Sequence, residues 1–104
     1  MHVPVHVCQF VVPHEHPALP GHFPGNPVVP GVLLIDHVLS LLEAISGPLP
    51  GLRLPQVKFL HPLLPGQAAQ VCLEGEAPRW RFRVLRGDTV LASGEVVAAP
   101  MAAG

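Results

Sequence analysis

The chain has 104 residues, of which 49% are hydrophobic and 12% charged, and its formal net charge is −1. This length accommodates one domain with one core, which we place at residues 1–104, and the near-neutral charge argues against nucleic-acid binding by bulk electrostatics. So few charges on so apolar a chain indicate a surface partly covered by a partner, and we therefore expect an oligomer.

The first predicted element is a strand over Val3–Val12, which is rich in β-branched residues. Pro4 confines that end to a sheet edge or a strand start. Residues 13–30 follow as a loop rich in proline and glycine, and a loop of this length is usually functional or disordered. Its aliphatic residues favour an ordered loop. Its prolines exclude a membrane-inserted helix, and we expect no signal peptide.

The only convincing helix is predicted over Gly31–Ser46. Pro30 and Gly31 open it, and Ser46-Gly47-Pro48 ends it. Apolar residues occupy most of its circumference, which predicts a helix buried on nearly all sides. At about 1.5 Å per residue it is about 24 Å long, enough to cross about four or five strands.

Four further strands are predicted after the helix, separated by turns: Leu54–Leu60, Ala68–Leu73, Arg79–Leu85 and Thr89–Ala98. A turn at Gly87-Asp88 joins the last two as a hairpin. One apolar helix with one antiparallel sheet predicts an α+β fold in which the sheet curls around the helix.

The stretch HFPGNPVVPGVLLIDHV, which begins at His22, gathers groups suited to acid–base chemistry. Pro30 and Gly31 place an unhindered amide at a helix start, where an oxygen that gains negative charge would find a donor. Asp36 is expected inside the buried helix, where an aspartate is costly unless paired or used. The residues alone leave two interpretations open: a catalytic set of base, acid and donor, or a surface or structural pair.

The segment HFPGNPVVPGVLLID is similar to the signature of the hot-dog-fold 3-hydroxyacyl-acyl-carrier-protein dehydratases. In that family an acidic residue follows the histidine after fourteen positions, which is the separation of His22 and Asp36. Val57–Gly66 (VKFLHPLLPG) resembles the strand and turn after the family's central helix, and the last hairpin also fits. The resemblance covers about residues 15–99. The compact chain resembles the dehydratases of aryl polyene pigment and specialised lipid pathways.

The resemblance implies a cytoplasmic lyase with the hot-dog fold, active as a homodimer or a higher even oligomer. Its substrate would be a 3-hydroxyacyl thioester on the phosphopantetheine of an acyl carrier protein, and its product the trans-2-enoyl thioester. His22 of one subunit would take a proton from C2, and Asp36 of the other would assist departure of the C3 hydroxyl. The backbone amides of Gly31 and Val32 would bind the thioester oxygen. No metal or organic cofactor is needed.

Three departures from the family pattern bear on this expectation. Many members carry Glu where Asp36 stands, and most carry Gln where Ser40 follows one turn later. The chain also lacks most of the N-terminal segment of the housekeeping enzymes. Two alternatives therefore stay open: an acyl-thioesterase, and a non-catalytic hot-dog subunit that supports a partner dehydratase. The His-Phe-Pro-Gly signature speaks against the first, and Ser40 favours the second.

The remaining polar residues have simpler interpretations. His14 and His16 lie near His22, but no matching Cys or Asp set follows, so we expect no metal site. Cys8 and Cys72 have no metal or redox spacing and are interpreted as small buried residues in a reduced cytosol. Three arginines share one strand face, which is either solvated or a docking surface for an acidic carrier: Arg79, Arg81 and Arg83.

Overall fold

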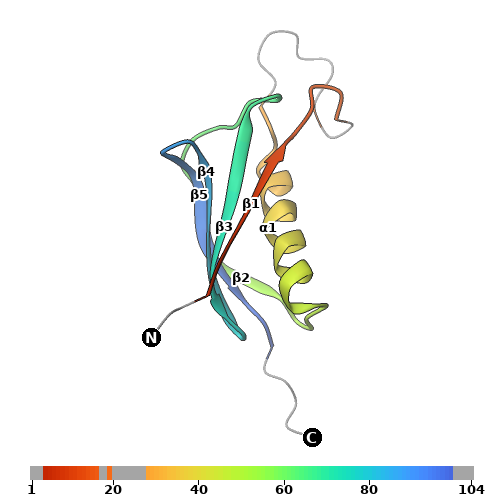
Figure 1. Cartoon of the computed structure of the whole chain (residues 1–104), viewed down its shortest axis with the longest axis vertical. Coiled ribbons are helices and arrows are strands. Elements are labelled where there is room, and N and C mark those ends of the chain that lie inside the picture. Colours follow the sequence, from red (N-terminus) through yellow and green to blue (C-terminus); the bar gives the residue numbers. More distant parts are fainter. Residues whose placement is uncertain (1–3, 17–18, 20–27, 100–104) are drawn as a thin grey trace, which may run out of the picture.

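One helix lies in the hollow of a curled five-stranded antiparallel sheet in the computed structural model, which describes residues 4–16, 19 and 28–99 (Figure 1). The elements in chain order are β1 (Val5–Val11), α1 (Gly31–Ser46), β2 (Arg53–Phe59), β3 (Ala68–Glu76), β4 (Arg79–Arg86) and β5 (Thr89–Val97). The strands are arranged in the order β1-β3-β4-β5-β2. The predicted α+β class, with the sheet wrapped around one long helix, is confirmed.

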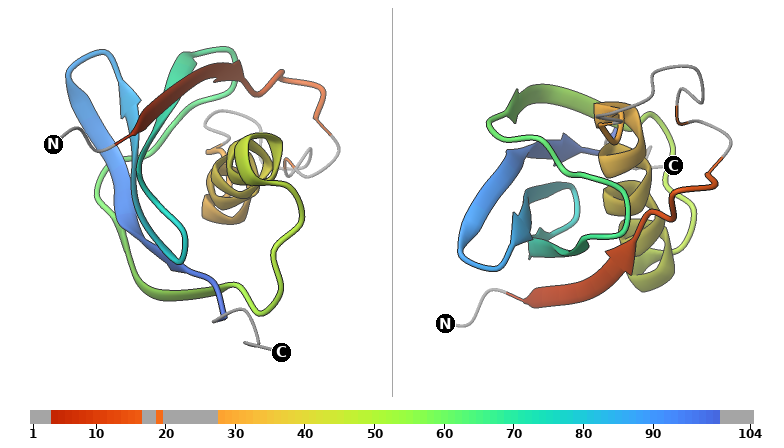
Figure 2. Two further views of the ribbon diagram at one scale, coloured as in Figure 1. Left: turned by 60° about the horizontal axis from the view of Figure 1, so that its bottom comes forward. Right: turned by 90° about the horizontal axis from the view of Figure 1, so that it is seen from above.

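The strands β3, β4 and β5 form a consecutive antiparallel meander, and β1 and β2 are added at its two edges. The edge position of β1 confirms the interpretation of Pro4. Register shifts interrupt the ladders between Arg53 and Gln56 in β2 and between Val84 and Leu85 in β4. Such irregularities bend a strand, and Figure 2 shows the sheet curving around the helix.

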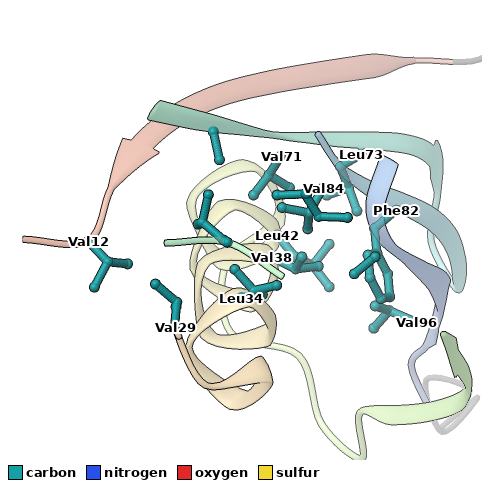
Figure 3. Close-up of a cluster of buried hydrophobic side chains, with 14 of the residues drawn as sticks. Val12, Val29, Leu34, Val38, Leu42, Val71, Leu73, Phe82, Val84 and Val96 are labelled. Atoms are coloured by element: carbon teal, nitrogen blue, oxygen red, sulfur yellow. The ribbon is translucent and has the colours of Figure 1, made fainter. Parts of the chain in front are cut away.

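One stripe of α1 forms the core with the inner face of the sheet. Leu34, Val38 and Leu42 are buried and recur at the spacing of successive helical turns. Alternate residues of β3 and β4 are buried, because only one face of the sheet packs on the helix. Figure 3 shows the sheet side chains that meet this stripe, which include Val71, Leu73, Phe82, Val84 and Val96.

The opposite face of α1 is uncovered, so the prediction of a helix buried on nearly all sides is wrong for the single chain. The Val32 side chain is 64% exposed, and Asp36 and Ser40 on the same face are also exposed. One sheet layer can contact a helix along one stripe only, and α1 packs mainly on β3 and β4. The apolar part of the uncovered face is therefore available to a second surface.

The predicted helix bounds agree with the structure, and the strand bounds shift by up to three residues. Gly47 ends the helix with φ of 77°, and its N–H donates to the Glu43 carbonyl at 2.8 Å. The expectation of buried cysteines is wrong, because Cys8 is exposed on the edge strand β1 and Cys72 is partly exposed. No helix in the described part of the chain combines the length and the apolar character needed to cross a membrane.

Candidate active site

The start of α1 presents backbone amides that the helix itself does not use. Pro30 precedes it with φ −58° and ψ 140°, and the Leu33 N–H donates to the Pro30 carbonyl at 2.9 Å. The N–H groups of Gly31 and Val32 come before this bond, and the first amides of a helix lack partners within it. The helix dipole adds partial positive charge, so this end favours an oxygen that carries negative charge.

An aromatic ring explains why residue 31 is a glycine. A Cβ atom on Gly31 would lie 2.7 and 2.8 Å from two ring carbons of Phe59, inside van der Waals contact. Phe59 is the last residue of β2 and is 56% exposed. The glycine therefore allows the ring at the end of the edge strand to lie directly against the start of the helix.

A pocket of about 550 Å³ opens at this junction. The helix start supplies Gly31 and Val32, and the end of β2 with the turn after it supplies Phe59, Leu60 and His61. Most other lining groups are aliphatic, and His61 is the only ionisable side chain among these lining residues, all of them in the described part of the chain. The pocket thus combines an apolar space for a hydrocarbon with backbone donors for an oxygen, a combination typical of small-molecule sites.

The sequence pattern places Gly31 and Val32 at this junction, whereas Phe59 and His61 were not predicted. Both missed residues lie in the segment VKFLHPLLPG. Its match to the family pattern was the available signal, but a strand followed by a turn does not show what the strand packs against. The contact between Phe59 and Gly31 exists only because β2 is added beside β5 at the edge of the sheet.

The structure describes only one of the two predicted acid–base residues. His22 lies outside the described residues, and most of the HFPGNP run lies there as well. Asp36 is exposed, so its expected burial is wrong for the single chain. Its exposure follows from its place on the uncovered face of α1. Among the described residues, no group of three His, Cys, Asp or Glu could hold a metal ion.

His37, beside Asp36 in the chain, packs the helix against β1. Its ring is stacked on Phe10, with ring centroids 4.0 Å apart and the planes inclined by 16°. Burial lowers the pKa of His37 from its usual value of 6.5, the Asp36 carboxylate opposes this by raising it, and His16 lowers it further. The neutral imidazole is therefore favoured in this contact, and His37 has a structural role in packing the helix against β1.

The three strand arginines lie on the outer face of the sheet, away from the helix. Residues 80, 82 and 84, which alternate with them in β4, are buried. Arg79 forms an ion pair with Glu95 at 3.3 Å. Arg81 and Arg83 are exposed, so this face of β4 carries positive charge into solvent.

Sequence relatives match most of the chain. Residues 4–95 match the family model described as ApeI-like, ApeI dehydratase. A 3-hydroxyacyl-[acyl-carrier-protein] dehydratase FabZ of Thermus thermophilus is 33% identical over 90 residues, which covers 84% of this chain and 53% of the relative. The chain spans about half the length of the curated relatives it matches.

Solved structures match the fold. The dehydratase heterocomplex ApeI:P from Xenorhabdus doucetiae matches with a TM-score of 0.77 and 25% identity, covering 89% of this chain and 85% of that chain. A variant of the fluoroacetyl-CoA-specific thioesterase FlK matches with a TM-score of 0.59 and 23% identity, covering 95% of this chain and 88% of that chain. This second likeness shows the fold alone.

Substitution of Gly31 tests the contact between the helix start and the ring. Gly31→Ala should lower the free energy of unfolding by about 1–3 kcal/mol, because the new methyl group overlaps the Phe59 ring. In a Phe59→Ala background the same change should be neutral or stabilising, because alanine is the better helix former. Urea denaturation of the four proteins in a double-mutant cycle measures the coupling. An equal loss in both backgrounds would show that the ring is not the cause.

The His37 contact makes folding stability depend on pH. The pKa of His37 is lowered in the folded chain, so its stabilisation is complete above the unfolded pKa of 6.5 and is lost as pH falls through the folded pKa. His37→Phe keeps a ring against Phe10 but cannot take up a proton. Urea denaturation at about pH 7.5 and about pH 5.5 should show a smaller loss of stability on acidification for this variant. The same loss in both proteins would contradict the assignment.

Proposed function

Because the chain belongs to the ApeI-like dehydratase family, we propose that it removes water from a 3-hydroxyacyl thioester on an acyl carrier protein. The product is the trans-2-enoyl thioester, made for fatty acid, aryl polyene pigment or related lipid biosynthesis. The observation that carries the proposal is the pocket at the start of α1, where the amides of Gly31 and Val32 border an apolar space beside Phe59. An acyl thioester requires such a space for its chain and donors for its oxygen.

In this reaction each predicted site residue has one task. The amides of Gly31 and Val32 bind the thioester oxygen, which gains negative charge when C2 loses a proton. His22 accepts that proton as the general base. Asp36 donates a proton, directly or through a water, to the C3 hydroxyl, which leaves as water while the C2–C3 double bond forms. The elimination is redox-neutral and needs no oxidant or reductant, and in this proposal His22 and Asp36 supply both proton transfers without a metal or an organic cofactor.

A second copy of the chain completes the site in this proposal. The strand β2 is an edge strand, and Phe59 and Leu60 at its end are 56% and 52% exposed. Together with Val32 on the uncovered helix face, they give a small chain an apolar surface of the kind that marks interfaces. A homodimer or higher even oligomer built through this surface brings His22 of one subunit to Asp36 of the other.

The proposed partner is an acyl carrier protein that carries the chain on phosphopantetheine. The exposed Arg81 and Arg83 on the outer face of β4 favour a partner with acidic residues. We place the reaction in the cytoplasm and assign residues 1–104 to one hot-dog domain.

A second candidate function is a non-catalytic subunit that supports a partner dehydratase. Ser40 favours it, because this residue stands exposed one turn after Asp36, where the family pattern has Gln. The similar structure from Xenorhabdus doucetiae is described as a heterocomplex, and pairing of two related chains fits such a role.

An assay with a 3-hydroxyacyl carrier protein separates these functions. The protein should produce the enoyl thioester, and His22→Ala and Asp36→Asn should each lower kcat by about 100- to 10,000-fold, the usual contribution of a general acid or base. Mass spectrometry follows the loss of water, and a thiol reagent detects hydrolysis. Glu43→Gln, at another exposed acid of α1, is the matched control and should keep full activity.

Each other outcome of this assay has a defined meaning. Release of thiol without enoyl product indicates a thioesterase. Neither product across several chain lengths contradicts the enzyme proposal, and activity restored by a partner dehydratase identifies the supporting subunit.

Mixing the two inactive variants tests whether the acid and base come from different subunits. A mixed dimer of His22→Ala and Asp36→Asn chains has one site with both substitutions and one site with neither. After random subunit exchange, activity should return to about one quarter of the wild-type value. If His22 and Asp36 act within one chain, the mixture stays as inactive as its components, which rules out the shared site.

A further inference from the structure

The loop of residues 60–67, between β2 and β3, is bonded to the segment that leads into the helix. The Val29 N–H donates to the Leu63 carbonyl at 2.8 Å, two residues before Gly31. Val29 and Leu63 are both buried, so this bond is shielded from water. Three other backbone bonds hold the loop. The N–H groups of Leu60 and His61 donate to the Leu91 carbonyl of β5 at 2.8 and 3.2 Å, and the Gly66 N–H donates to the carbonyl of Val12, just after β1, at 2.8 Å.

One charged side chain holds both ends of this loop. Arg86, the last residue of β4, donates from Nη1 to the Pro62 carbonyl at 3.0 Å and to Oε1 of Gln67 at 3.2 Å. The same Gln67 oxygen accepts a bond from the Leu64 N–H at 3.0 Å. The two hydrogens of one guanidinium nitrogen therefore bridge residues at the beginning and the end of the loop, and bonds from a charged donor are stronger than neutral ones.

Within the described part of the chain, Arg86 forms no ion pair with a carboxylate. The only ion pair among the described residues joins Arg79 and Glu95, whereas the Arg86 side chain donates to two neutral oxygens of the loop. Arg86 is partly buried, so these bonds also compensate its loss of water. The Arg86 side chain therefore serves to hold the loop.

We propose that Arg86 is a positioning residue for the site at the start of α1, an inference that rests on the proposed dehydration. The guanidinium fixes the Pro62 carbonyl, and the next carbonyl, that of Leu63, receives the Val29 N–H. Pro30 follows with its restricted φ, so a displacement of Val29 also displaces the amide of Gly31. One wall of the pocket is the helix start with Gly31, and the other is the end of β2 with Phe59. Arg86 thereby sets the distance between these two walls without touching the substrate.

Both walls are linked to Arg86 through the same loop. His61 adjoins Pro62 and lines the pocket together with Phe59 and Leu60. Leu63 lines it as well, beside Val29 on the helix side. A shift of the loop would therefore move the apolar wall and the amide donors relative to each other, and a misplacement of about 1 Å at a reacting centre can cost about 100-fold in rate.

The first test needs no activity. Amide hydrogen exchange at Val29 and Leu64 is compared in wild type, Arg86→Ala, Arg86→Lys and Arg83→Ala, the last a matched change of an exposed arginine on the same strand. Exchange should be about tenfold or more faster in Arg86→Ala, unchanged in Arg83→Ala and partly restored in Arg86→Lys. Unchanged exchange at Val29 in Arg86→Ala overturns the proposal.

The second test is kinetic and uses a 3-hydroxyacyl thioester of N-acetylcysteamine, which has no carrier protein. Arg86→Ala should lower kcat by about tenfold or more with a smaller change in KM, because the site still binds the chain but misaligns its oxygen. Circular dichroism at the assay temperature confirms that the protein is folded. Recovery of kcat by Arg86→Lys supports positioning, and an unchanged kcat in Arg86→Ala contradicts it.

Two provisions keep the outcome decisive. If Arg86→Ala does not fold, Gln67→Met replaces one of the two acceptors of Arg86 by an apolar side chain of similar size. Both tests are then carried out on Gln67→Met and on Arg86→Lys. If the wild-type protein has no lyase activity, the proposed function fails, whereas the exchange rates at Val29 still decide whether Arg86 positions the helix start.

Discussion

An apolar helix covered by a single sheet layer is the constraint on which the rest of this structure depends. The curled sheet covers the stripe of Leu34, Val38 and Leu42 and leaves the opposite face of α1 open. Asp36 lies on this open face with little desolvation penalty, because water still reaches its carboxyl. A second surface placed there would bury apolar area and withdraw that water in the same event, so assembly and creation of an acid–base site would be one process.

The candidate site is built from main-chain groups whose positions depend on distant parts of the chain. The donors at the start of α1 are backbone amides, and the wall opposite them is the ring of Phe59 at the end of an edge strand. Gly31 lets the two meet, and the loop of residues 60–67 connects them through the bond between Val29 and Leu63.

Local patterns were sufficient for most of the fold. Pro30 and Gly47 delimit the helix because one presets φ at its start and the other adopts a positive φ at its end. The alternation of arginines with Trp80 and Phe82 identifies the half-buried strand β4. Burial was predicted less well, since apolar residues all around a helix show only what the helix could bury and not how many surfaces are present to cover it. The exposed Asp36 and Cys8 both reflect this limit.

The sequence by itself determined the order and type of the elements and the family. It also placed Gly31, Val32 and Asp36 along one helix, because these depend on residues close together in the chain. The tertiary structure alone decided that Phe59 and His61 line the same pocket as Gly31, and that Arg86 braces the loop beside it. These contacts join segments far apart in the chain. They exist only once the strand order has brought the end of β2 next to the helix start and the end of β4 next to the loop that follows β2.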